Sequence, residues 1–225
     1  MMDSVVVVRN ASAERLSRGE ETRSRILEAA RQVLAEEGIN RFTTRRVAAI
    51  AGVSHGMCHY HFKDKRDLVL ALVEHARRDW VEPLERIVNG AGPAESRARS
   101  VIAWMAEPAT IEVMRVHLAL FWFALGDEEV REHLAGEYAR WRKPFVTLFR
   151  EVADELSLIS LDPHGVGEAF ASAADGLVQQ QVLDPALQTE HLLTSLFNRI
   201  VAAERDVGTS GQKEPNLSRS TRGSK

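Results

Sequence analysis

The sequence predicts an all-α fold, in which a small N-terminal three-helix domain with a helix-turn-helix is followed by a larger helical domain. Apolar residues recur at intervals of three and four in successive segments, and no stretch alternates as a strand does. Glycine or proline separates these segments. With 225 residues and 44% hydrophobic content, the chain is long enough for one domain plus a smaller one.

The first strongly periodic segment covers residues 20–37 and predicts a helix that ends at Gly38. Two very short helices are then expected within residues 43–66. Thr43 and Ser54 can cap them through their hydroxyl groups, and Gly52 allows the sharp reversal between them. This is the layout of a helix-turn-helix whose second helix enters the DNA major groove.

Polar, aromatic and cationic side chains of this stretch are the candidates for DNA contacts. The candidates for positioning phosphates are Thr43, Thr44, Tyr60, His61 and Lys65. The candidates for reaching base edges are Arg45, His55 and His59. Ser54 and Gly56 have a partly structural role, as the cap and the thin start of the second helix. Met57 and Cys58 are expected to face inward.

An alternative interpretation of this stretch is a zinc site. His55, Cys58 and His59 share one face of a helix, but Cys58 is needed in the core and no carboxylate is close by. An enzyme is also disfavoured, because the chain has no nucleophile elbow, phosphate-cradling glycine loop or metal-binding His-Glu pair. We therefore expect no catalytic residue, metal or cofactor.

Charge is unevenly distributed along the chain. Residues 1–66 hold 12 Lys or Arg and 8 Asp or Glu, a balance of +4, which leaves −7 for the remainder of a chain whose total is −3. Six cations in residues 41–66 face only Asp64; they are Arg41, Arg45, Arg46, Lys63, Lys65 and Arg66. A basic patch on an otherwise acidic protein favours phosphate binding at one place over nonspecific coating of DNA.

Residues 43–68 resemble the N-terminal domain of TetR-family transcriptional regulators. The matching positions are Thr43, Val47, Ala48, Ala51, Gly52, Val53, Ser54, Gly56, His61, Phe62, Lys65 and Leu68. Residues 25–43 also fit the family's first helix and loop. The run Gly-Met-x-His-Tyr-His-Phe is similar to the BetI-like branch, named for a choline-responsive repressor. Many members carry Leu or Ile in place of Cys58 and Tyr in place of His59.

The resemblance implies a ligand-responsive regulator, by family default a repressor, that binds a palindromic operator in double-stranded DNA as a homodimer. A small-molecule inducer would release it. We expect a flexible arm over residues 1–19, the DNA-binding domain over 20–66, and an effector-binding and dimerisation domain over 67–204. Residues 205–225, rich in Ser, Gly, Lys and Arg, are expected to be a disordered tail. The alternatives are a nonspecific DNA-binding protein and a metal-dependent enzyme.

Beyond residue 68, periodicity and breaks predict further helices. They cover about residues 65–88, 94–105, 109–125, 127–156, 163–183 and 185–203. Pro83 and Pro144 are expected to bend or disturb two of them.

Aromatic and sulfur-containing residues concentrate in the middle of the chain. Those that the family resemblance suggests for a ligand pocket are Trp104, Met114, His117, Phe121, Trp122, Tyr138 and Trp141. Aromatic faces with Glu112 or Glu137 could hold a quaternary ammonium group. Ordinary core packing is the alternative for each of them.

The last two predicted helices each carry a wide apolar stripe. The residues of these two stripes that are candidates for contacts in a four-helix dimer interface are Phe170, Ala174, Leu177, Leu193, Phe197 and Ile200. Internal packing is again the alternative. A single cysteine, no signal-peptide core and no apolar span approaching twenty residues together predict a cytoplasmic protein without membrane contact.

Overall fold

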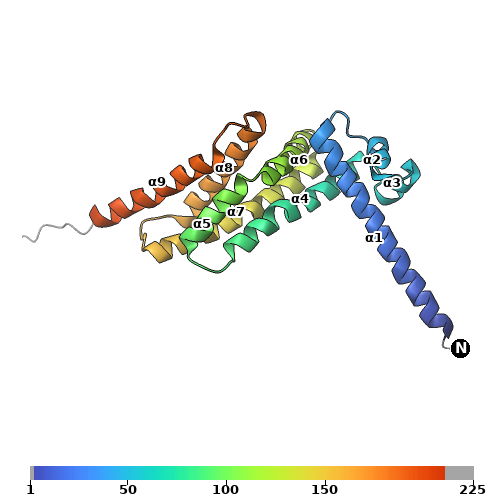
Figure 1. Ribbon diagram of the computed structural model, residues 1–225, viewed down its shortest axis with the longest axis horizontal. Helices are drawn as coiled ribbons and strands as arrows, with labels where there is room; N and C mark the ends of the chain where they lie inside the picture. Colours follow the sequence, from blue (N-terminus) through green and yellow to red (C-terminus); the bar gives the residue numbers. More distant parts are fainter. Residues whose placement is uncertain (1–2, 211–225) are drawn as a thin grey trace, which may run out of the picture.

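The computed structural model describes the backbone of residues 3–210 and the side chains of residues 18–75 and 77–205. Regular secondary structure in this part of the chain is entirely α-helical, which confirms the predicted fold class (Figure 1). The helices are α1 (Asp3–Glu37), α2 (Thr44–Ala51), α3 (His55–His61), α4 (Lys65–Val88), α5 (Ala94–Met105), α6 (Pro108–Ala124), α7 (Glu128–Leu156), α8 (Pro163–Leu183) and α9 (Thr189–Ser210). No helix among these residues is long and apolar enough to cross a membrane.

Local capping defines the helix-turn-helix formed by α2 and α3. The hydroxyl of Thr43 accepts a hydrogen bond from the backbone N–H of Arg46, and Ser54 accepts one from Met57, each at 3.1 Å. Gly52 ends α2 with φ of 65°, in the left-handed region that glycine adopts without strain. The predicted caps and turn are therefore confirmed.

The side chains of α1, α2, α3 and the start of α4 enclose the first core. Its largest fully buried members here are Ile26, Leu34, Phe42, Phe62 and Leu68. Cys58 is fully buried as expected, but Met57 is 45% exposed, so the prediction that it faces inward is wrong. Adjacent residues of a helix point about 100° apart, and in this pair it is Cys58 that faces the core.

The two ends of the described chain differ from the expected boundaries. α1 begins at Asp3, so the backbone of residues 3–19, expected as a flexible arm, continues the helix through Gly19. A glycine inside a helix costs only about 1 kcal/mol relative to alanine, which does not stop a helix. α9 continues to Ser210, and the rest of the predicted tail lies outside the described residues.

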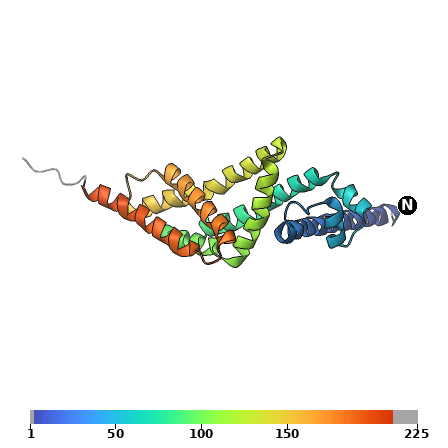
Figure 2. The same ribbon diagram turned by 90° about the horizontal axis from the view of Figure 1, so that it is seen from above.

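The remaining helices build an elongated second domain, with α4, α5 and α7 running side by side and α9 extending to the end far from α2 and α3 (Figure 1). α4 continues through Pro83, and α7 continues through Pro144. α6 crosses the bundle at a steep angle (Figure 2). α8 packs closely on α7, because a Cβ at Gly167 would lie only 2.7 Å from the Cα of Val146.

The first core does not stop at the expected domain boundary after residue 66. It continues into the second domain through side chains of α6 and α7, namely Val116, Leu120, Ala124, Val130 and Leu134. The helix-turn-helix is thus in continuous packing contact with the helices that follow it.

Candidate functional site

The predicted DNA-contacting residues lie mainly on one surface formed by α2 and α3. Seven of them are exposed: Thr43, Arg45, Ser54, His55, Gly56, His59 and Tyr60. Thr44 Oγ1 lies 3.2 Å from His55 Nε2, and this contact joins the start of α2 to the start of α3. The rings of His55 and His59 meet edge to face, with centroids 4.4 Å apart. The pairing of these side chains gives the surface a defined shape.

The hydrogen bond of His59 determines which of its ring nitrogens can act as an acceptor. His59 Nδ1 lies 3.0 Å from the carbonyl oxygen of Lys63. A carbonyl can only accept, so Nδ1 carries the proton in the neutral ring, and Nε2 is left as an acceptor. An acceptor at this point is suited to the amino groups that adenine and cytosine present in the major groove.

Three of the six cations in residues 41–66 are engaged within the protein. Arg46 forms a two-pronged ion pair with Glu37 of α1. Arg66 lies 2.9 Å from Asp127 and 2.5 Å from Glu129, at the start of α7. The third is Lys65. The cations that remain exposed, with no ion pair among the described residues, are Arg41, Arg45 and Lys63.

Lys65 and His61 are less accessible to DNA than the sequence suggests. Lys65 Nζ lies 3.4 Å from the carbonyl oxygen of Ile39 and 5.6 Å from the ring centroids of both Phe42 and Phe123. Burial lowers the pKa of Lys65. His61 is half-buried, and burial followed by the charge of Arg23 lowers its pKa. Both side chains are therefore only partly accessible to solvent.

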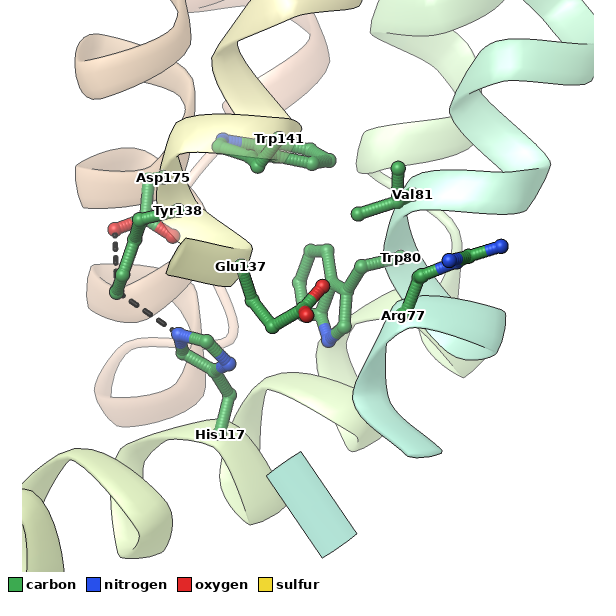
Figure 3. A pocket seen from close by; sticks show the side chains of 8 residues that line it. All are labelled: Arg77, Trp80, Val81, His117, Glu137, Tyr138, Trp141 and Asp175. Carbon is green, nitrogen blue, oxygen red and sulfur yellow. Dashed lines mark hydrogen bonds between the residues drawn. The ribbon is translucent and has the colours of Figure 1, made fainter. Parts of the chain in front are cut away.

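A second candidate site lies between α4, α6, α7 and α8, where aromatic rings surround a small cavity (Figure 3). Trp80 meets Trp141 at 90° with centroids 5.5 Å apart, and it lies 5.9 Å from His117. The cavity has a volume of about 20 Å³. Its lining residues are Arg77, Trp80, Val81, His117, Glu137, Tyr138, Trp141 and Asp175.

Three predicted pocket residues, His117, Tyr138 and Trp141, line this cavity. Trp104 packs against Trp80 and Trp141 behind the wall, and Met114 is fully buried in the core. The other two lie outside, with Phe121 43% and Trp122 68% exposed. His117 is the residue of α6 that lines the cavity, and Phe121 and Trp122 lie in the turn that follows it.

The residues that the sequence analysis missed come from α4 and α8. Trp80, Arg77 and Val81 lie on α4, which precedes the aromatic-rich middle of the chain in the sequence. Asp175 had a recognisable signal, because it is a carboxylate inside an otherwise apolar stripe of α8. A buried charged group in such a stripe needs a partner or a function.

Hydrogen bonds link three lining side chains in a row. His117 Nε2 lies 2.9 Å from the Tyr138 hydroxyl, which donates to Asp175 Oδ2 at 3.4 Å. Gln179 donates to the same oxygen at 2.7 Å. Burial lowers the pKa of His117 to about 4, so its ring is neutral at pH 7. Burial also raises the pKa of Asp175 and, together with that carboxylate, the pKa of Tyr138.

Several buried polar atoms around the cavity have no hydrogen-bond partner among the described residues. They are Trp80 Nε1, Trp141 Nε1, His117 Nδ1 and Glu137 Oε2. The other carboxylate oxygen of Glu137 is paired with Arg140. Buried polar groups are usually hydrogen-bonded, so a cluster of unpaired ones around a cavity indicates a place for a ligand.

The six predicted dimer contacts divide into two groups. Phe170, Ala174, Leu193 and Phe197 are buried within the core of the single chain. Leu177 and Ile200 are only partly buried. On the same outer side of α9, Leu192 is 39% exposed and Leu196 is partly buried, at four-residue intervals before Ile200.

Two family models match this chain. The one described as "Bacterial regulatory proteins, tetR family" matches residues 26–72. The one described as "BetI-type transcriptional repressor, C-terminal" matches residues 93–205, about half of the chain. The chain belongs to the TetR family. The predicted family and its BetI-like branch are confirmed, and this family consists of transcriptional regulators rather than enzymes.

Among the relatives of this TetR-family protein, the repressor BepR of Brucella suis is 44% identical over 57 residues, 25% of this chain and 27% of BepR. This chain therefore spans only about a quarter of that relative, and similarly of the regulator TtgR of Pseudomonas putida. The regulator BetI of Rhizobium meliloti is 25% identical over 166 residues, 73% of this chain and 79% of BetI.

Solved structures share the fold of this TetR-family protein. A TetR-family regulator from Rhodococcus sp. is 25% identical and has a TM-score of 0.68, with 82% of this chain and 99% of that chain covered. A transcriptional regulator from Saccharomonospora viridis in complex with choline is 21% identical and has a TM-score of 0.69, with coverage of 80% and 96%.

Proposed function

We propose that this protein is a ligand-responsive repressor that binds a palindromic operator as a homodimer and is released by a small organic cation. One observation carries the proposal. α4 begins four residues after the end of α3 in the sequence, and its residue Trp80 lines the aromatic cavity. At 1.5 Å per residue, Trp80 lies roughly 22 Å along the helix from Lys65. A change in the shape of the cavity can therefore move the helix-turn-helix.

The α2–α3 surface supports the DNA side of the proposal. α3 exposes His55, His59 and Tyr60, and the exposed cations flank it. A helix of two turns contacts too few base pairs for useful specificity. Two copies related by a two-fold axis would read half-sites one helical turn apart, about 34–36 Å.

The outer surfaces of α8 and α9 are the proposed dimer interface. Leu177, Leu192, Leu196 and Ile200 remain at least partly exposed there. α9 extends toward the end of the molecule far from α3 (Figure 1). Phe170, Ala174, Leu193 and Phe197, which are buried in the core, pack beneath this surface and hold α8 and α9 in place. Pairing the two helices with their copies would remove the exposed apolar area from water.

The lining of the cavity favours a cationic ligand. Trp80, Trp141 and Tyr138 offer aromatic faces, and Glu137 and Asp175 supply two carboxylates, whereas Arg77 is the cation among the lining residues. Aromatic faces attract organic cations, by about 2 kcal/mol or more when water is excluded. The likeness in fold to a regulator solved with choline agrees with this class of ligand.

The cavity must open for such a ligand to bind. A volume of about 20 Å³ holds one water molecule, so an organic cation would have to displace the aromatic side chains. Trp80 and His117 also line a second small cavity, whose far side is formed by Arg31 of α1. Displacing these two rings would therefore reach α1 as well as α4, and would favour a state in which the two recognition helices no longer match successive major grooves.

A selection of DNA from a random pool by the full-length protein would test the DNA side. A two-fold symmetric consensus sequence is expected, and equal affinity for all sequences would instead support the nonspecific alternative. Choline or a related amine would then be titrated into the labelled complex while fluorescence anisotropy is measured. Release is expected for the native protein, and Trp80→Ala should keep operator binding but lose the response.

A further inference from the structure

We infer that the effector donates N–H hydrogen bonds, and that it is a protonated primary, secondary or tertiary amine rather than a quaternary ammonium ion. This inference rests on the proposed function, because it concerns the ligand of the same cavity. It follows from the two buried acceptors that the protein leaves unpaired there, His117 Nδ1 and Glu137 Oε2.

The row of hydrogen bonds from His117 to Asp175 shows why His117 Nδ1 is an acceptor. The Asp175 carboxylate can only accept, so the hydroxyl hydrogen of Tyr138 is directed to it. The Tyr138 oxygen then accepts from His117, whose proton must be on Nε2. The ring is neutral at pH 7, and Nδ1 is therefore left with a lone pair and no hydrogen.

Glu137 provides the second acceptor and the negative charge. One of its oxygens is held by Arg140, and the other is buried without a partner. Figure 3 shows the Glu137 carboxylate between His117 and Trp80, so both acceptors border the same space. A donor that enters between them can satisfy one or both.

The number of N–H groups on a ligand then decides how many acceptors remain unpaired. A quaternary ammonium group carries a full charge and gains the aromatic contacts, but its nitrogen has no hydrogen to donate. An unpaired buried acceptor weakens binding by roughly tenfold. A protonated amine gains the same aromatic contacts and also pairs the acceptors.

Four compounds isolate this property: ethanolamine, N-methylethanolamine, N,N-dimethylethanolamine and choline. All carry the same hydroxyl group and one positive charge at pH 7, and each methylation removes one N–H. Isothermal titration calorimetry of the full-length protein with each compound would measure the preference. We expect at least one of the three amines to bind about tenfold or more tightly than choline.

Variants assign the preference to particular atoms. In His117→Leu, the Nδ1 acceptor is gone and no other side-chain acceptor replaces it, while Tyr138 can still donate to Asp175, so the preference for amines should fall by about tenfold. Glu137→Gln should weaken binding of every cation and also reduce the preference. Glu132→Gln is the matched control, because Glu132 is an exposed glutamate on the same helix and should leave all four affinities unchanged.

The outcomes separate this inference from the proposed function. If choline binds as tightly as every amine or more tightly, the inference is overturned, while a cationic effector remains. If none of the four compounds binds, both fail. An amine preference that persists in His117→Leu and Glu137→Gln would overturn the assignment to these two acceptors.

Discussion

Arg66 and Asp127 join the helix-turn-helix to the second domain through an ion pair of 2.9 Å. Arg66 lies in the first turn of α4, and Asp127 caps α7 by accepting a hydrogen bond from the backbone N–H of Val130 at 3.1 Å. Arg66 also lies 2.5 Å from Glu129. A rotation of the DNA-binding helices relative to α7 must therefore break the ion pairs of Arg66 or move Asp127 and Glu129 together with Arg66.

Arg66→Gln should weaken the communication between ligand and DNA more than it weakens the fold. Exposed ion pairs contribute about 0–1 kcal/mol, so the unfolding temperature should change little. The fold-change in operator affinity caused by a saturating ligand should drop several-fold, as measured by anisotropy with and without ligand. Arg131→Gln is the control, because Arg131 pairs with Glu128 inside α7. Equal effects of the two variants would contradict a role for the junction.

The salt dependence of operator binding should separate Lys63 from Lys65. Lys63 is exposed beside α3, whereas Lys65 is directed toward the carbonyl oxygen of Ile39 between two aromatic rings. Lys63→Ala should reduce the slope of log K against log salt by about one phosphate contact. Lys65→Met should leave the slope unchanged and lower stability instead. A reduced slope for Lys65→Met would show that Lys65 contacts phosphate.

His59→Ala should relax the sequence preference at one position in each half-site. The acceptor Nε2 of this exposed side chain can distinguish bases that present an amino group in the major groove, a difference of about 1–3 kcal/mol. Operator variants with single base changes, measured against the native protein and the variant, would reveal the position. His133→Ala is the control, since His133 is an exposed histidine on α7, outside the helix-turn-helix. A uniform loss across all operators would instead indicate a phosphate contact.

The buried His117 should make stability fall as pH decreases. Its pKa is about 4 in the folded protein and about 6.5 when unfolded, so below pH 6.5 the unfolded chain binds the extra proton. Between pH 6.5 and 5 the native protein should lose about 2 kcal/mol relative to His117→Gln. Urea denaturation at both pH values would measure this difference. Asp175, whose pKa is raised, is present in both proteins and cancels in the comparison.

Leu192→Glu should disrupt the proposed dimer. A charge on the outer stripe of α9 would have to be desolvated between the two copies. Light scattering should show a monomer at micromolar concentration, and operator affinity should fall by roughly two orders of magnitude as the second recognition helix is lost. Ile159→Glu is the control, because Ile159 is 90% exposed in the turn before α8. A dimer that survives Leu192→Glu would place the interface elsewhere.

The helix-turn-helix was predictable because local interactions define it. Thr43, Gly52 and Ser54 act within three or four residues of their own position, through caps and a left-handed turn. The starts of α5 after Pro93 and of α8 at Pro163, and the end of α6 before Gly126, follow from the same local rules. Such features need no knowledge of distant parts of the chain.

Only the tertiary structure determined which residues line the cavity and which cations of the helix-turn-helix remain exposed without an ion pair among the described residues. Trp80 and Asp175 are 95 residues apart in sequence, and only the packing of α4, α7 and α8 brings them to the same space. The sequence shows that Lys65 and Arg66 are cationic. It does not show that Lys65 contacts the carbonyl oxygen of Ile39 and that Arg66 pairs with Asp127. Periodicity likewise marks Phe197 and Leu192 as apolar, but not which of them a neighbouring helix covers. Capping depends on adjacent residues, whereas burial and ion pairing depend on which helices meet, and this difference sets the limit of what the sequence alone determined.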